Sequence, residues 1–204
     1  MNTQTLLSIV ADQREELLAN DYSELCLRPE ESQLDLKSNR AQVVIGVRRC
    51  GKSTLCEMFL KQKGIDFAYV NFDDDRMEDM KASDLDHLLE ALYMTYGEFK
   101  YLFLDEIQNI EGWPLFVNRL LRQKMHLFIT GSNSKLLSKE LSTHLTGRNN
   151  KVELYPFSYS EYCAMKNIDT TSLSTKAKGI RKSTLHEYLL PVSYTHLTLP
   201  TNRE

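Results

Sequence analysis

The sequence has few of the features that mark membrane, secreted or low-complexity proteins. No apolar run approaches the roughly 20 residues that a membrane span needs, and the N-terminus lacks the basic and apolar pattern of a secretory signal. Its four cysteines form no C-x-x-C pair, which favours free thiols in a reducing compartment over disulfides or a metal site. We therefore expect a cytoplasmic globular protein with no membrane partner.

The sequence also lacks an excess of charge of either sign. A formal net charge of −3 gives no overall attraction to nucleic acid or to an anionic membrane surface. Hydrophobic residues make up 42% and charged residues 26% of the chain, with only 8 glycines and 5 prolines, which is an ordinary globular composition. At 204 residues the chain can form one good-sized domain and part of a second.

The most informative feature that is present is a glycine-rich loop at residues 46–53. This segment reads Gly-Val-Arg-Arg-Cys-Gly-Lys-Ser and matches the phosphate-binding pattern G-x-x-x-x-G-K-[ST]. An apolar run at 43–45 enters it as a buried strand would, and helical apolar spacing follows it. Lys52 is expected to reach the β- and γ-phosphates and Ser53 to ligate Mg²⁺. The residues expected to bind the nucleotide are Gly46, Val47, Arg48, Arg49, Cys50, Gly51, Lys52, Ser53 and Thr54.

Two members of this loop allow more than one interpretation. A thiol at a helix N-terminus can have a lowered pKa, so Cys50 is either an oxidation-sensitive group or a small filler residue. Arg48 and Arg49 have three candidate partners, which are the phosphates, the acidic run at 73–75 and another molecule.

A second motif follows about fifty residues later. The apolar residues 101–104 lead into Asp105 and Glu106, so both carboxylates emerge where an open α/β sheet presents its ligands. In that position Asp105 would hold Mg²⁺ through water, and Glu106 would accept a proton from the attacking water. The alternative is a solvated acidic turn. It is disfavoured because the motif follows the glycine-rich loop by about fifty residues, with one strand and one helix between them.

Three further residues are candidates for the catalytic site. Ser132, and after it Asn133, follow the apolar strand 126–130 and would bond the γ-phosphate or the attacking water, or else cap the next helix. Arg148 precedes the fifth expected strand. It is either an arginine finger that acts across a boundary between identical subunits or a solvated residue at a helix end.

The apolar periodicity predicts alternating helices and strands after an N-terminal helix. Strands separated by helices of this length indicate a parallel sheet covered on both faces, which is an α/β fold. Helices are expected at 4–19, 52–63, 83–97, 113–121 and 134–145, and strands at 42–46, 67–72, 101–104, 126–130 and 152–155.

In combination these motifs are similar to one family, over about residues 5–165. It is the bacterial and archaeal AAA-type ATPases that pair an ATPase core with a C-terminal domain of uncharacterised role. The segments that carry the resemblance are 46–55, 71–74, 104–108, 112–113, 130–133, 145–148 and 154–162.

The resemblance implies that the chain has a P-loop NTPase fold and binds ATP and Mg²⁺. The fold would be a three-layer αβα sandwich around a mostly parallel five-stranded sheet of the additional-strand type. A lid or winged-helix segment would follow the core, and the C-terminal domain would resemble nucleases in fold. This chain departs from the family at Cys50, where relatives commonly have Ser or Gly, and it lacks most of the lid and the C-terminal domain.

The expected organisation has four parts. Residues 1–40 form the N-terminal helix and a connecting segment, 41–157 the ATPase core, and 158–191 the start of a truncated lid. Residues 192–204 are expected to be non-native, because 192–201 resemble the translation of a transposase adapter used in DNA sequencing; a genuine threonine-rich coil is the alternative.

The expected function is Mg-dependent ATP hydrolysis that drives or gates a downstream effector domain. The alternative is a nucleotide-gated switch that binds DNA or protein with little turnover. A small-molecule kinase on the same fold is disfavoured by the Asp105–Glu106 pair. A DNA or protein partner would bind through the missing C-terminal part, and a homo-oligomer would form through Arg148.

Overall fold

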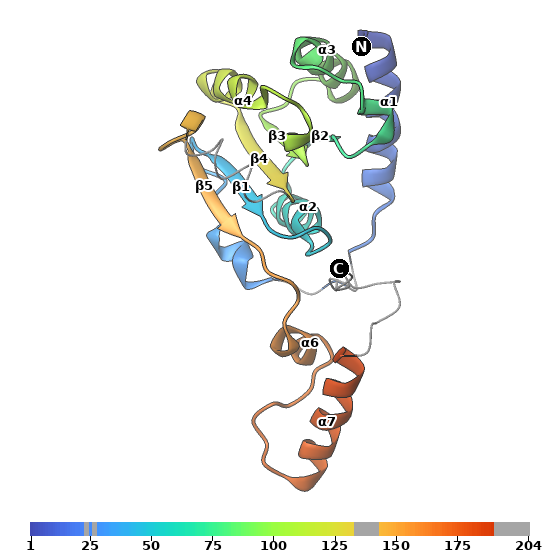
Figure 1. Ribbon diagram of the computed structural model, residues 1–204, viewed down its shortest axis with the longest axis vertical. Helices are drawn as coiled ribbons and strands as arrows, with labels where there is room; N and C mark the ends of the chain where they lie inside the picture. The colour runs from blue at the N-terminus through green and yellow to red at the C-terminus, as the bar shows by residue number, and fades with distance from the viewer. Residues whose placement is uncertain (23–24, 26–27, 133–142, 190–204) are drawn as a thin grey trace.

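A computed structural model describes residues 1–22, 25, 28–132 and 143–189 of the chain (Figure 1). Asn133, most of the expected helix 134–145 and the stretch 192–204 lie outside these residues. The helices are α1 (Thr3–Ala19), α2 (Lys52–Gln62), α3 (Leu85–Tyr96), α4 (Trp113–Arg122), α6 (Tyr159–Met165) and α7 (Thr175–Leu189). The strands are β1 (Ala41–Ile45), β2 (Phe67–Asn71), β3 (Tyr101–Asp105), β4 (His126–Gly131) and β5 (Asn149–Glu153), and the short 3₁₀ turns are η1 (Pro29–Gln33), η2 (Asp75–Met77), η3 (Ala82–Asp84) and η4 (Ile107–Asn109).

The five strands form one sheet in the order β2-β3-β4-β1-β5, and every neighbouring pair is parallel. β4 lies between β1, which leads into the glycine-rich loop, and β3, which ends on Asp105. Because all the strands run the same way, their carboxyl ends meet at one edge of the sheet. The strand order therefore places the end of β4 between the two sequence motifs.

Successive side chains of each strand point to opposite faces of the sheet, so the core has two layers. Val43 and Ile45 join the cluster that packs against α1, α3 and α4, whereas Val44 joins the cluster beneath α2. β3 repeats the pattern, with Leu102 and Leu104 on the first face and Phe103 on the second. Apolar residues on both faces are typical of a buried parallel strand, and the result is a three-layer α/β fold.

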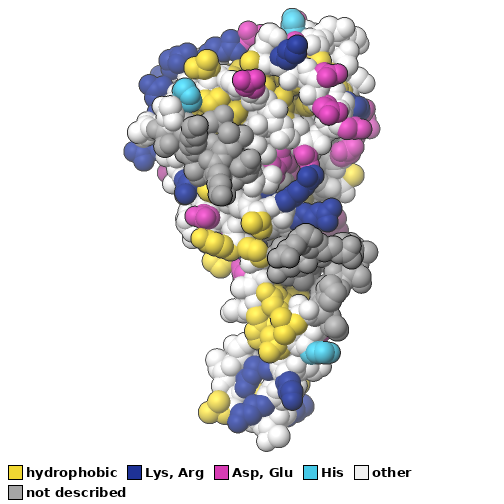
Figure 2. Space-filling model, viewed as in Figure 1, with side chains coloured by type: hydrophobic (Ala, Val, Ile, Leu, Met, Phe, Trp, Pro, Cys, Tyr) yellow, Lys and Arg dark blue, Asp and Glu magenta, His cyan; other side chains and the backbone are white. Residues whose placement is uncertain are grey.

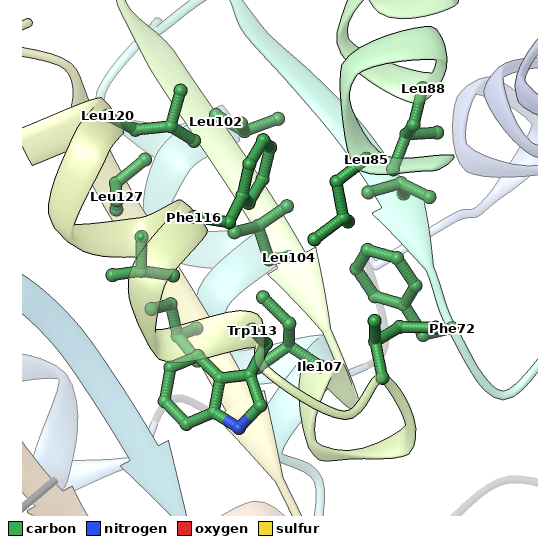
Figure 3. Packing of buried hydrophobic residues seen from close by; sticks show 14 of the residues in the cluster. Phe72, Leu85, Leu88, Leu102, Leu104, Ile107, Trp113, Phe116, Leu120 and Leu127 are labelled. Carbon is green, nitrogen blue, oxygen red and sulfur yellow. The ribbon is translucent and has the colours of Figure 1, made fainter. Parts of the chain in front are cut away.

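The layer beneath α3 and α4 is the larger of the two clusters (Figure 3). Trp113 and Phe116 of α4 and Leu88 of α3 point toward the sheet, and all three are buried. α1 contributes Leu6 and Val10 to the same cluster, since it packs on α3 and β2. The N-terminal helix is thus part of the core packing.

The chain beyond β5 extends away from the sheet (Figure 1). There α6 packs against α7, with the rings of Tyr162 and Tyr188 5.6 Å apart. Among the described residues, none of the helices has the combination of length and apolar composition needed to cross a bilayer.

Candidate active site

A cleft of about 280 Å³ opens at the carboxyl edge of the sheet. Its walls come from the loop after β1, the first turn of α2, and the ends of β2 and β3. The residues that line it are Arg48, Arg49, Gly51, Lys52, Ser53, Thr54, Asn71, Asp73, Asp105 and Glu106. Both sequence motifs therefore contribute to one cavity.

The glycine-rich loop depends on glycine at both of its ends. Gly51 has φ +94°, a left-handed conformation that side chains disfavour, and α2 begins directly after it. At Gly46 a Cβ atom would lie 2.2 Å from the carbonyl oxygen of Leu154 and 2.8 Å from Cys50 Sγ. The N-terminus of α2 thus faces the cleft with its unpaired N–H groups and positive dipole end, which is a ready site for a phosphate.

Ser53 and Asp105 meet inside the cleft. The Ser53 hydroxyl donates to Asp105 Oδ1 at 2.8 Å, and the Tyr69 hydroxyl lies 3.4 Å from Oδ2. The Thr130 hydroxyl also donates to Oδ1. Burial raises the pKa of Asp105, although the hydrogen bonds from Thr130 and Ser53 oppose that shift. The carboxylate is therefore fixed in direction by three hydroxyl groups.

Glu106 is held by groups from three segments. Its Oε1 lies 3.2 Å from Lys52 Nζ, and its Oε2 accepts from Gln108 Nε2 at 2.6 Å and from the Ser132 N–H and hydroxyl at 2.8 Å each. Burial opposes ionisation, but the bonds from Gln108 and Ser132 and the charge of Lys52 keep the pKa of the carboxyl below its ordinary value. Its backbone is left-handed, with φ +53°, which turns the side chain toward the loop.

Residues 38–163, more than half of the chain, match the protein family described as AAA domain. The chain belongs to this family. It is also 39% identical over 158 residues to an uncharacterized protein of Methanocaldococcus jannaschii, a match that covers 77% of this chain and 35% of that protein. An uncharacterized protein of Haemophilus influenzae is 39% identical over 139 residues, covering 64% of this chain and 35% of the relative.

The chain thus spans about a third of the length of these curated relatives. Among solved structures, the Walker-type ATPase of Pyrococcus abyssi is similar with a TM-score of 0.48 and 17% identity, covering 81% of this chain and 62% of that one.

Three loop residues of this AAA domain lie away from the cleft centre. Cys50 is fully buried behind the loop, where its thiol contacts the carbonyl oxygen of Leu154 at 3.5 Å. Burial raises the pKa of this thiol, so of the two interpretations of Cys50 the lowered pKa is wrong and the small filler residue agrees with the structure. Val47 is exposed, but its carbonyl oxygen accepts from Lys52 Nζ at 3.2 Å. Gly46 is buried at the start of the loop.

The arginine candidates occupy different places. Arg48 pairs with Asp73 at 2.8 Å, which is one of the three partners expected for it. Arg148 is exposed just before β5 and donates to Asn118 Oδ1 at 2.9 Å. Since that is the amino end of the strand, Arg148 lies at the opposite edge of the sheet from its own cleft.

Thr130 and Gln108 belong to the site, but sequence reasoning assigned neither a role there. The Thr130 hydroxyl accepts from the Glu106 N–H at 3.0 Å while it donates to Asp105. One signal could have marked Thr130, because it is the polar residue that ends the apolar run of β4. Gln108 gives no comparable signal, since its contact depends on the left-handed turn at Glu106.

The donor set suits a hard divalent cation. Ser53 and Asp105 offer a hydroxyl and a carboxylate oxygen side by side, and Mg²⁺ is bound through one or two carboxylates together with water and substrate phosphates. Among the described residues, no group of three or more His, Cys, Asp or Glu side chains could hold a metal by itself. Ser53 and Asp105 could thus supply two of the oxygen ligands of such a cation.

Proposed function

We propose that this AAA domain binds ATP with Mg²⁺ in the cleft and hydrolyses it. The observation that supports this most directly is the 2.8 Å contact between Ser53 and Asp105, beside the Lys52–Glu106 pair at 3.2 Å. One ammonium group, two carboxylates and a neutral hydroxyl thus line one cavity. Membership of the AAA family supports nucleotide binding. The arrangement of Lys52, Ser53, Asp105 and Glu106 supports hydrolysis.

Lys52 and the start of α2 would bind the phosphates. The lysine side chain is 3% exposed and already directed into the site, so little ordering would be needed. In the present arrangement its ammonium group is shared between Glu106 and the carbonyl oxygen of Val47. An incoming polyphosphate would compete for Lys52 and free one oxygen of Glu106.

Glu106 would then act as the general base. A base must be ionised and lie within reach of the water that it deprotonates. Its bonds to Ser132 and Gln108 would keep the carboxylate aimed at the cleft after Lys52 has turned to the phosphates. Ser53 and Asp105 would hold Mg²⁺, which supplies charge neutralisation at the phosphates.

The substitution Glu106→Gln tests the hydrolysis. We expect nucleotide binding to persist and phosphate release to slow by about 10²–10⁴-fold, because the amide cannot take a proton. Glu111→Gln, which alters an exposed glutamate near the same turn, is the matched control and should leave the rate unchanged. Phosphate release at the wild-type rate in Glu106→Gln would contradict the proposed role.

A nucleotide-gated switch with little turnover is a second candidate. It is favoured by one observation, namely that both carboxylate oxygens of Glu106 already have partners. In that case wild-type protein would bind ATP and release phosphate no faster than Glu106→Gln.

The relatives of this chain are longer than the chain itself, which bears on its wider biological role. Because the chain covers 35% of each curated relative, we propose that ATP turnover drives or gates an effector in the remaining part, through which DNA or protein would bind. A nuclease-like fold for that part follows from family resemblance. Arg148 lies exposed at the edge of the sheet away from its own cleft, and we propose that it would leave Asn118 to approach the cleft of a second copy.

A further inference from the structure

Arg28 lies at a junction of three parts of the chain. It precedes η1, and its side chain is 9% exposed although it carries a full charge. The guanidinium donates to the carbonyl oxygens of Cys50 at 3.3 Å and Tyr155 at 2.8 Å, and to Glu161 Oε1 at 2.6 Å. It also lies over the ring of Phe157, 5.4 Å from its centroid. One buried cation thus joins the phosphate loop, the segment after β5 and helix α6.

The contact with the phosphate loop reaches its rear face. The N–H groups of such a loop turn toward the phosphate, so carbonyl groups face away from it. The carbonyl of Cys50 is bound from behind by Arg28, and the thiol of the same residue contacts Leu154. Leu154 is in turn bonded through its N–H to Ile45, the last residue of β1, at 2.7 Å. A shift of the loop would therefore move the Cys50 carbonyl oxygen and change its hydrogen bond with Arg28.

The contact with α6 involves Glu161, the third residue of this helix. Glu161 forms a capping box with Ser158, whose N–H and hydroxyl donate to Oε2 at 2.7 and 2.6 Å. The other oxygen, Oε1, accepts from Arg28. Burial opposes ionisation of this carboxyl, but the bonds from Ser158 and the charge of Arg28 hold its pKa below the ordinary value. The same carboxylate therefore caps α6 and binds Arg28.

From these contacts we infer that Arg28 is a positioning residue that couples occupancy of the phosphate loop to the docking of α6. The inference rests on the proposed nucleotide site. A phosphate in the loop would fix the Cys50 carbonyl, and a fixed carbonyl would hold the guanidinium against Glu161 and the start of α6. Coupling of this kind is reciprocal, so docked α6 would strengthen nucleotide binding by the same factor.

The test compares hydrogen exchange in α6 with and without MgATP in the full chain. In wild type we expect nucleotide to slow exchange of the amides in Tyr159–Met165. Glu161→Gln keeps the size of the side chain and one oxygen that can accept from Ser158. It removes the negative charge that Arg28 binds. We expect it to abolish the nucleotide-dependent part of the protection and to weaken ATP binding by about fivefold to tenfold, the lower end of typical coupling factors.

Arg28→Gln should reproduce both effects, and the double variant should bind ATP no more weakly than Arg28→Gln alone, because the two residues share one interaction. Glu187→Gln, which breaks the exposed Lys166–Glu187 pair between α6 and α7, is the control and should respond to nucleotide as wild type does. If Arg28→Gln fails to fold, as judged by thermal unfolding, Glu161→Gln still decides the question.

The outcomes separate this inference from the proposed function. Wild type that binds no nucleotide would refute the proposed function. Wild type that binds nucleotide without a change of exchange in α6 would overturn the coupling alone, and so would an undiminished response in Glu161→Gln.

Discussion

The Ser53 hydroxyl lies 2.8 Å from Asp105 Oδ1 although 52 residues separate the two in the chain. Ser53 is carried by the first turn of α2, and Asp105 ends β3, two strands away from β1. The contact spans the end of β4, whose Thr130 hydroxyl also donates to Asp105. A neutral donor, a carboxylate and a helix N-terminus thus converge where a phosphate and its cation would bind.

Asp105→Asn should raise the Mg²⁺ concentration needed for ATP turnover. The amide keeps the size of the side chain but removes the negative charge, so half-saturating Mg²⁺ is expected to rise by about tenfold or more. A magnesium titration of phosphate release measures the change. Partial recovery at high Mg²⁺ is expected, and an unaltered titration curve would argue against the cation site.

Lys52→Ala should weaken MgATP binding by roughly 10–100-fold, the value of a charge-assisted hydrogen bond to phosphate. The measurement is equilibrium binding of a fluorescent ATP analogue. Lys63→Ala, on an exposed lysine at the end of the same helix, serves as the control and should bind normally. Equal affinity in the two variants would remove Lys52 from the site.

Thr130→Val should destabilise the protein and slow turnover together. Valine keeps the shape but leaves the Glu106 N–H and one Asp105 oxygen without their shared hydroxyl, at a cost of about 1–3 kcal/mol in the free energy of unfolding. Thr130→Ser retains the hydroxyl and should recover most of the loss. Urea unfolding and phosphate release give the two readouts, and identical behaviour of Val and Ser would contradict the bridging role.

The stability of the protein should fall as the pH rises through the range in which Glu57 titrates. Burial, and after it the negative charge of Asp105, raises the pKa of Glu57 from 4.5 to about 7. The folded state then holds a proton that the unfolded state releases, so the free energy of unfolding decreases between these values, by at most about 3 kcal/mol.

Glu57→Gln cannot ionise, so it should lack this decrease and gain stability relative to wild type as the pH rises from 4.5 to 7. The hydrogen bonds that the carboxylate accepts from Asn20 and Tyr22 can be kept by the amide oxygen. Glu15→Gln, at an exposed site on α1, is the control. Parallel stability–pH curves for wild type and Glu57→Gln would count against the shifted pKa.

Gly46→Ala should impair both folding and nucleotide binding. The added Cβ would lie 2.2 Å from a backbone carbonyl oxygen of Leu154, which cannot rotate away, so the loop or β5 must move. We expect a loss of about 1–3 kcal/mol in the free energy of unfolding. At Gly179 in α7, an added Cβ would meet no other atom within 4 Å, so Gly179→Ala should not lower the free energy of unfolding. Thermal unfolding of the two variants measures the difference.

Some elements were predicted from local pattern alone. The run at 43–45 and the run at 101–104 became β1 and β3, because buried parallel strands need apolar residues on both faces. The fifth strand was expected at 152–155 and lies at Asn149–Glu153. It is an edge strand with polar residues at 149–151, and its extent is set by backbone pairing with β1, which leaves no trace in the side-chain pattern.

The sequence by itself determined the α/β fold and the two motifs of the cleft, since apolar periodicity and a glycine-rich loop are local properties of the chain. Only the tertiary structure decided that Thr130 bridges the two acids, that Gln108 holds Glu106, and that Arg28 joins the loop to α6. The Thr130 and Arg28 contacts join segments whose spacing in the sequence carries no information about distance, whereas the Gln108 contact is local and depends on the backbone conformation at Glu106. Strand order and a left-handed turn at Glu106 set them, and both depend on the packing of the whole domain.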